Sequence, residues 1–220
     1  MSHQVGSALP DPRLPLDEEA AADAFDRIVD GLADDDRIAA FLLALAERGE
    51  TAAEIAAAAR ALRLRMVPVS APAGAIDVCG TGGDGQHTLN ISTAVAFVVA
   101  AAGVPVAKHG NRAASSQSGA ADVLSALGWN DELGIDRLEA ALAEVGIAFL
   151  HAQRHHPAMA RVAPIRRQLG RRTIFNLLGP LANPAGVKRQ MIGVFAPEYA
   201  PRVAEAGALL GAERLLAVHG

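Results

Sequence analysis

The sequence has little of several residue types, and each shortage excludes a class of protein. Its single cysteine, Cys79, excludes an internal disulfide framework and a cysteine metal cluster. Aromatic residues make up only 4% of the chain, which argues against a stacking platform for single-stranded nucleic acid. Apolar runs such as 94–106 are interrupted by Gly103 and Pro105 and fall short of the roughly 20 residues that span a membrane.

A secretory signal is missing as well, because residues 1–16 lack a basic start and an apolar stretch. Hydrophobic residues nevertheless make up 51% of the 220 residues, enough to bury the core of one or two domains. We therefore expect a soluble, cytoplasmic protein.

Negative charge is absent from two long stretches, although the net charge is −4. No Asp or Glu occurs in 85–121, which holds Lys108 and Arg112, or in 145–197. The cations of the second stretch are Arg154, Arg161, Arg166, Arg167, Arg171, Arg172, Lys188 and Arg189. Such stretches can concentrate positive potential at an anionic ligand, although a solvated basic face explains a charge run taken alone.

Residues 1–66 show the apolar spacing of short helices. Asp34, Asp35 and Asp36 would cap the second helix, and Thr51 with Glu54 would form a capping box for the third. The residues that would form one apolar stripe along each helix are Phe25, Ile28, Val29, Leu32, Phe41, Leu42, Leu45, Ile55, Ala59 and Leu62. The pattern predicts an all-helical N-terminal domain.

Residues 75–220 alternate between short apolar strands and helices, which predicts a larger α/β domain with a mainly parallel central sheet. We expect strands near 76–79, 104–107, 147–150, 191–195 and 215–219, and helices near 92–102, 120–127, 136–145 and 199–210. Two further short helices, 156–169 and 173–181, are limited by Pro157, Pro164, Pro180 and Pro184, and we expect the 156–184 segment to join the helical domain in space. Ligands of such sheets gather beyond the carboxyl ends of the strands.

Two polar loops follow the first two predicted strands. The first, 80–85, is rich in glycine and precedes a helix start, so its backbone N–H groups could hold a diphosphate. The second begins with Lys108, His109, Asn111 and Arg112, whose cations suit a phosphate. A tight turn alone would also explain the glycines, but two such loops at neighbouring strand ends favour an anion site.

Three segments carry a resemblance to a known family: GTGGDGQHTLNIST at 80–93, KHGNRAASSQSGAAD at 108–122 and HPAMARVAPIRRQLGRRTIFNLLGPLANP at 156–184. Together with ALAERGETAAEIAAAARAL in the helical part, they resemble anthranilate phosphoribosyltransferase from about Leu16 to Gly220. The resemblance implies a small helical domain beside a larger α/β domain, as in nucleoside phosphorylases. It also implies transfer of a phosphoribosyl group to the amine of anthranilate in tryptophan biosynthesis.

The resemblance further implies which residues bind each substrate. Those implied to contact 5-phosphoribosyl 1-diphosphate are Gly80, Gly83, Asp84, Thr88, Asn90, Ile91, Ser92, Thr93, Lys108, Asn111, Arg112, Ala113, Ala114, Ser115, Ser116 and Ala120. Those implied to face anthranilate are Gly80, His109, Asn111 and Arg166, with Arg166 meeting the carboxylate. Ser92 is implied to bind Mg²⁺, and no residue is assigned as a general acid or base.

The resemblance also implies a homodimer formed through the helical domain. The family pattern continues beyond the VHG at 218–220 into an acidic pair that helps to hold Mg²⁺, so a C-terminally truncated chain with an incomplete α/β domain is expected. Ala120 and Gln153 stand where the family often has Ser and Pro. The alternatives are a nucleoside phosphorylase-like enzyme and a non-catalytic relative that binds nucleic acid through the basic 154–189 region.

Overall fold

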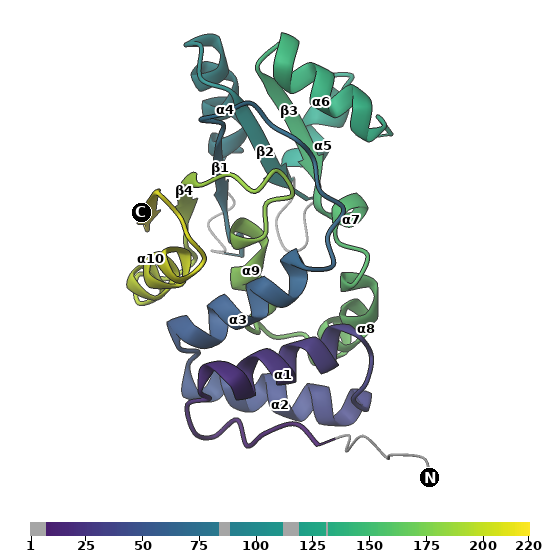
Figure 1. Cartoon of the computed structure of the whole chain (residues 1–220), viewed down its shortest axis with the longest axis vertical. Coiled ribbons are helices and arrows are strands. Elements are labelled where there is room, and N and C mark those ends of the chain that lie inside the picture. The colour runs from purple at the N-terminus through teal and green to yellow at the C-terminus, as the bar shows by residue number, and fades with distance from the viewer. Residues whose placement is uncertain (1–7, 84–88, 112–118, 131) are drawn as a thin grey trace.

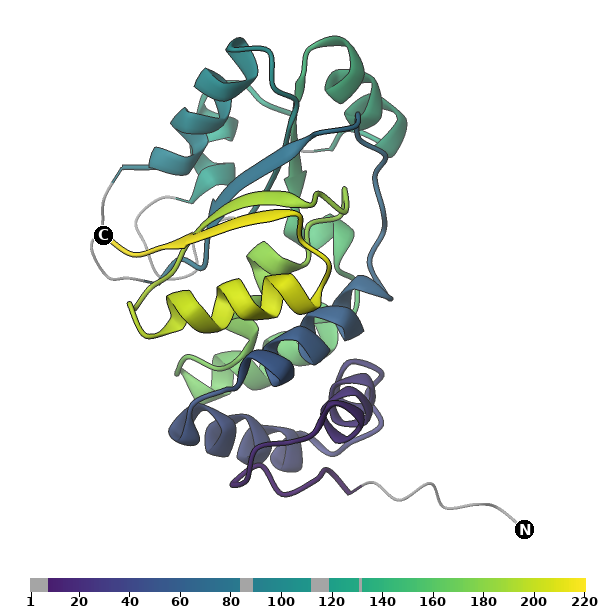
Figure 2. The same cartoon turned by 60° about the vertical axis from the view of Figure 1, so that its left-hand side comes forward.

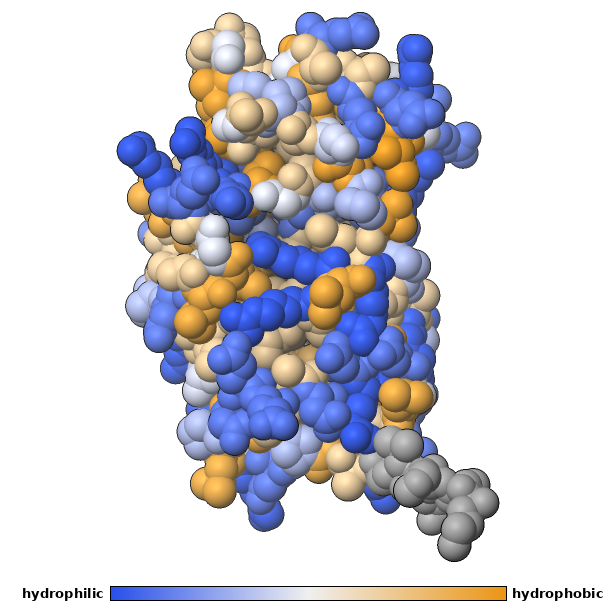
Figure 3. Space-filling view, viewed as in Figure 1, coloured by the Kyte–Doolittle hydropathy of each residue, from blue (hydrophilic) through white to orange (hydrophobic). Residues whose placement is uncertain are grey.

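The computed structural model describes residues 8–83, 89–111, 119–130 and 132–220. Three helices form the N-terminal part: α1 (Glu18–Val29), α2 (Asp35–Arg48) and α3 (Ala52–Arg63). They lie at one end of the molecule, below the sheet in Figure 1. On the face shown in Figure 3, hydrophilic side chains predominate over this helical end.

The helix starts follow from their capping residues. Thr51 and Glu54 form the predicted capping box of α3. Asp34 occupies the N-cap of α2, but its side chain makes no capping hydrogen bond. One stripe position is wrong: α1 ends at Val29, and Leu32, which follows the turn, is 58% exposed.

In the described part of the chain, five parallel strands form a single sheet in the order β3-β2-β1-β4-β5. They are β1 (Ile76–Gly80), β2 (Val106–Gly110), β3 (Ile147–His151), β4 (Arg189–Gly193) and β5 (Arg214–Val218). The mainly parallel sheet is therefore as predicted, and the carboxyl ends of all its strands share one edge.

Two strand predictions are displaced along the chain. β2 covers 106–110 instead of 104–107, because its partners β1 and β3 both begin their pairing with it at Val106. Lys108 and His109 therefore lie inside a buried strand and not in the loop after it. β4 covers 189–193 instead of 191–195, because Arg189 is already in register with Ile76 and Arg214.

Helices cover the sheet and connect its strands. Helix α4 (Ile91–Ala101) connects β1 to β2, α5 (Ala120–Ala126) and α6 (Ile135–Glu144) connect β2 to β3, and α10 (Tyr199–Leu209) connects β4 to β5. Figure 2 shows α10 running between the sheet and α3. Helix α4 lies against β1 and β2, yet of its apolar sequence only Thr93 and Ala96 are buried, which leaves an open apolar surface there.

The segment between β3 and β4 contains three short helices: α7 (Ala152–His155), α8 (Met159–Leu169) and α9 (Phe175–Leu181). The helix expected over 156–169 is present as α8, which begins at Met159, and α7, which lies before it, had no predicted counterpart. Pro164 lies inside α8 and Pro180 inside α9, so neither proline ends its helix. Helices α8 and α9 share one buried apolar cluster with α1, α2 and α3.

The same cluster includes Cys79 and Ile192 from the sheet, so the helices and one sheet face have a common core. Among the helices that the structure describes, none is both long enough and apolar enough to cross a membrane.

Candidate functional site

The turn after β1 requires glycine at several positions. Gly82 and Gly83 have φ angles of 64° and 74°, which residues with a side chain rarely adopt. A Cβ on Gly80 would lie 3.2 Å from the carbonyl oxygen of Gly193, so β4 closely approaches this position. Gly80 and Gly82 are exposed, so the backbone is accessible at the end of β1. The predicted ligands Asp84 and Thr88 lie outside the described residues.

The start of α4 provides the second part of the candidate phosphate site. Asn90 is the N-cap, Ile91 is exposed and Ser92 is half-buried. Thr93 is 3% exposed, and its hydroxyl has no hydrogen-bond partner among the described residues. A helix N-terminus attracts anions through its unpaired N–H groups and dipole, so this end of α4 suits a phosphate.

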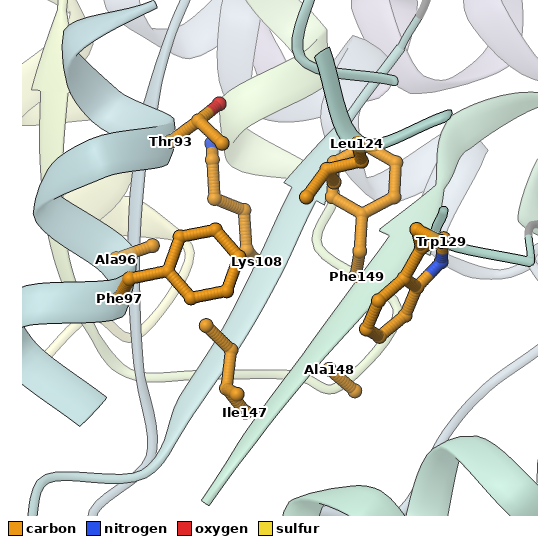
Figure 4. A pocket seen from close by; sticks show the side chains of 9 residues that line it. All are labelled: Thr93, Ala96, Phe97, Lys108, Leu124, Trp129, Ile147, Ala148 and Phe149. Carbon is orange, nitrogen blue, oxygen red and sulfur yellow. The ribbon is translucent and has the colours of Figure 1, made fainter. Parts of the chain in front are cut away.

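Lys108 reaches the same region from β2. Its side chain is 3% exposed, and Nζ donates a hydrogen bond to the carbonyl of Val78 at 2.8 Å. In Figure 4 the Lys108 side chain extends toward Thr93 through an apolar pocket. The pocket is lined by Thr93, Ala96, Phe97, Lys108, Leu124, Trp129, Ile147, Ala148 and Phe149. An ammonium group donates up to three hydrogen bonds, so Lys108 can still donate to a ligand.

Asn111 follows β2 and contacts the end of β3. A ring nitrogen of His151, Nε2, lies 3.2 Å from Asn111 Oδ1. Ala120 begins α5 and is half-buried. The predicted ligands Arg112, Ala113, Ala114, Ser115 and Ser116 lie outside the described residues.

His109 points to the opposite face of the sheet from Lys108. Its Nδ1 lies 2.8 Å from the carbonyl oxygen of Gly179 in α9. A carbonyl can only accept, so Nδ1 carries the proton and the neutral ring leaves a lone pair on Nε2. That atom is buried and has no partner among the described residues. Burial and the neighbouring His156 lower the pKa of His109 to about 3, which keeps the ring neutral.

His156 packs beside His109, with ring centroids 5.2 Å apart. It is 6% exposed, and burial is the main cause that lowers its pKa to about 4. The two neutral, polarisable rings thus pack against each other between β2 and the segment before α8. Sequence reasoning did not assign His156 a role of its own, although the HHP motif placed two histidines next to a proline.

Arg166 lies in the last turn of α8 and is half-buried. Its guanidinium carbon lies 5.8 Å from the centroid of the Phe175 ring, and burial lowers the pKa of the group. Within the described ranges no carboxylate pairs with it, whereas Arg161 and Arg171 of the same acid-free stretch pair with Asp35 and Glu47. A half-buried guanidinium of this kind suits a carboxylate ligand.

Two further buried residues, which the sequence did not single out, support this arrangement. Asp77 on β1 accepts hydrogen bonds from His109 N at 3.2 Å and from Asn183 Nδ2 at 2.8 Å. Burial raises the pKa of Asp77, and the positive charge of Lys108 opposes that shift. A charged residue in the middle of an apolar strand was the available signal, because fully buried Asp is rare without partners.

No cluster of three or more His, Cys, Asp or Glu side chains in the described ranges could hold a metal ion. Ser92 offers one hydroxyl at the first turn of α4. Mg²⁺ commonly completes its shell with substrate phosphates and water, so this donor fits an ion that arrives with a diphosphate.

Comparisons with known proteins agree with this architecture. The sequence profile described as glycosyl transferase family, a/b domain, matches residues 73–220, and that described as glycosyl transferase family, helical bundle domain, matches residues 12–66. The anthranilate phosphoribosyltransferase of Novosphingobium aromaticivorans is 61% identical over 212 residues, which cover 96% of this chain and 64% of that protein. The chain thus spans less than two thirds of the length of this relative.

Solved structures give the same result. The crystal structure of anthranilate phosphoribosyltransferase from Thermus thermophilus matches with a TM-score of 0.90 and 49% identity, over 94% of this chain and 63% of that one. The Saccharomyces cerevisiae enzyme in complex with PRPP and Mg matches with a TM-score of 0.83 and 33% identity, over 91% and 61% of the two chains. The chain therefore belongs to the glycosyl transferase family that includes the anthranilate phosphoribosyltransferases.

Proposed function

We propose that this chain forms the substrate-binding part of an anthranilate phosphoribosyltransferase. The enzyme would transfer the phosphoribosyl group of 5-phosphoribosyl 1-diphosphate to the amine of anthranilate, giving N-(5-phosphoribosyl)anthranilate and diphosphate in L-tryptophan biosynthesis. One observation carries the proposal: consecutive residues of β2, Lys108 and His109, face opposite sides of the sheet. Lys108 faces the helix N-terminus of α4, and His109 faces α9.

The diphosphate and the ribose 5-phosphate would bind on the α4 side. The proposed contacts are Gly80, Gly83, Asp84, Thr88, Asn90, Ile91, Ser92, Thr93, Lys108, Ala120 and the segment Asn111 to Ser116. Lys108 and the N–H groups at the start of α4 would stabilise the charge that grows on the leaving diphosphate. Mg²⁺, held by Ser92 and the phosphate oxygens, would neutralise part of the same charge.

Anthranilate would bind on the other side, near Gly80, His109, Asn111 and Arg166. The Arg166 guanidinium would donate two parallel hydrogen bonds to its carboxylate. His109 would stay neutral and would therefore not compete for that carboxylate. The amine nitrogen would form a bond to C1 of the ribose while the bond from C1 to the diphosphate oxygen breaks. The electron pair would leave with the diphosphate, and the amine would lose one proton to water. The chain's own contribution is positioning of the two reacting atoms and electrostatic stabilisation.

The proposal includes a cytoplasmic homodimer that pairs through the helical part. Leu14, Leu32 and Leu64 are 67%, 58% and 78% exposed there, so apolar surface is available for pairing. Light scattering at micromolar concentration tests it: a dimer mass supports the proposal, and a monomer mass removes the dimer from it.

Calorimetric titration tests the choice of substrates. The chain is titrated with 5-phosphoribosyl 1-diphosphate and Mg²⁺, then with anthranilate, and separately with phosphate and a pyrimidine nucleoside. Binding of the first pair alone is the expected result. Binding of the nucleoside and phosphate instead would favour the nucleoside phosphorylase alternative.

A further inference from the structure

The pairing between β1 and β2 stops after one position. Ile76 and Val106 are the single pair in register between these strands, whereas β1–β4, β2–β3 and β4–β5 each pair over five positions in the described residues. The Ile76 N–H donates to the Pro105 carbonyl at 2.9 Å, which sets the phase of the ladder. In a parallel ladder of this phase, the next step would join His109 N–H to the Val78 carbonyl and Val78 N–H to the Ala107 carbonyl.

Side chains occupy three of these four backbone groups instead. Lys108 Nζ donates to the Val78 carbonyl at 2.8 Å. Asp77 Oδ1 accepts from His109 N at 3.2 Å, and Asn183 Nδ2 donates to the Ala107 carbonyl at 2.8 Å. Buried backbone N–H and C=O groups must be paired, so these side chains replace the hydrogen bonds that β1 and β2 do not make with each other.

Asp77 and Asn183 are also joined to each other, through the 2.8 Å hydrogen bond from Nδ2 to Oδ2. Asn183 Oδ1 accepts from Ala185 N at 2.8 Å, so the bridge fixes the segment that follows α9. Both residues are buried, with 0% and 3% exposure. The bridge therefore connects β1, β2 and the end of α9, from which the Gly179 carbonyl reaches the His109 ring.

We propose that Asp77 and Asn183 are positioning residues, which hold the β1–β2 seam open and thereby orient Lys108 toward one substrate and His109 toward the other. The inference rests on the proposed function for the identity of those substrates. The open seam leaves the Lys108 side chain, and not a backbone amide, on the Val78 carbonyl. The Asp77–Asn183 bridge also holds the His109 backbone in the strand while the His109 ring contacts α9. One bridge therefore positions both Lys108 and His109.

The test compares three variants of the full chain. Asp77→Asn replaces one of the two acceptor oxygens, Oδ1 for His109 N or Oδ2 for Asn183, with an NH₂ donor. Asn183→Ala breaks the same bridge from its other end, should the first variant not fold. Gln190→Leu is the control, because Gln190 is also buried and donates to the Pro180 carbonyl at 2.8 Å, from a strand that β1 separates from β2. Each variant is assayed for thermal unfolding, for affinity toward 5-phosphoribosyl 1-diphosphate with Mg²⁺ and toward anthranilate, and for the ¹⁵N shifts of the His109 ring.

A folded Asp77→Asn or Asn183→Ala chain should bind both substrates about tenfold more weakly, the equivalent of one hydrogen bond to a charged group. The ¹⁵N shifts of its His109 ring should lose the Nδ1–H signature. Gln190→Leu should lose a comparable amount of stability but keep the wild-type substrate affinities and His109 ring shifts. Wild-type affinities and ring shifts in both folded bridge variants would overturn the inference. If the wild-type chain binds neither substrate, the proposed function fails instead, and the His109 ring shifts alone decide the inference.

Discussion

Arg166 offers a perturbation in which stability and ligand binding should change in opposite directions. Its guanidinium is half-buried and has no carboxylate partner within the described ranges, so the folded chain pays for desolvating a charge. Arg166→Met removes the charge and keeps an unbranched apolar stem. Because no charge is then desolvated on folding, the free energy of unfolding should rise by about 1–2 kcal/mol, within the range of single stabilising substitutions.

The lost contact with Phe175 offsets part of that gain. At 5.8 Å the guanidinium is near the limit of a cation–π interaction, which contributes about 0.5 kcal/mol at such a distance. The net expectation is a stabilisation of about 0.5–1.5 kcal/mol, or a rise in Tm of about 1–6 °C for a chain of this size. Anthranilate affinity should fall at least about 10- to 150-fold, because even one of the two hydrogen bonds to the charged carboxylate contributes about 1.5–3 kcal/mol.

Differential scanning calorimetry and titration of anthranilate fluorescence measure the two effects. Arg167→Met is the matched control, since Arg167 is the exposed next residue of α8. It should change both quantities little. A lower Tm for Arg166→Met together with unchanged anthranilate affinity would refute the reasoning, because Arg166 would then be a structural residue.

Three other predictions concern different parts of the molecule. Glu54→Ala should destabilise the chain by about 3–5 kcal/mol in urea unfolding, because this buried carboxylate accepts from Leu16 N, Thr51 N and Arg48. Glu47→Ala, at an exposed pair with Arg171, should cost less than about 1 kcal/mol, and equal losses would contradict the difference in burial. The pKa values of His109 and His156, about 3 and about 4 against 6.5 unfolded, mean that the unfolded chain binds more protons below pH 6.5. Stability should therefore be retained above pH 6.5 and fall as the pH decreases toward 4, by up to about 1.4 kcal/mol per pH unit for each histidine. His156→Gln should make this decline shallower between pH 6.5 and 5, and an unchanged slope would contradict the assignment. Ser92→Ala should weaken binding of 5-phosphoribosyl 1-diphosphate about 3- to 10-fold more with Mg²⁺ than in EDTA; equal losses in both would show that Ser92 contacts the phosphate alone and not the ion.

The sequence predicted the parallel sheet and most helices because their signals are local. Apolar spacing, the Thr51–Glu54 capping box and the glycines after helices each act within a few residues. The position of β2 could not be found this way. Lys108 and His109 look like loop residues, and only the pairing with β3 and the partners Val78 and Gly179 show that a buried strand can contain them.

The candidate site shows the same division. The glycine-rich turn and the cationic loop could be recognised as motifs, because the residues of each are consecutive in the sequence. The Asp77–Asn183 bridge was not, because its two members are far apart in the chain and become neighbours only when α9 packs against the sheet. His156 is a similar case, since its role depends on the ring of His109 across that contact.

The most direct test of the proposed activity is the fluorescence of anthranilate after the purified chain is mixed with 5-phosphoribosyl 1-diphosphate and Mg²⁺. We predict a fall in fluorescence that requires both the chain and the diphosphate donor, with one diphosphate released for each anthranilate consumed. Fluorescence that stays constant, both for this chain and after the remaining third of the Novosphingobium aromaticivorans relative is joined to it, would contradict the account.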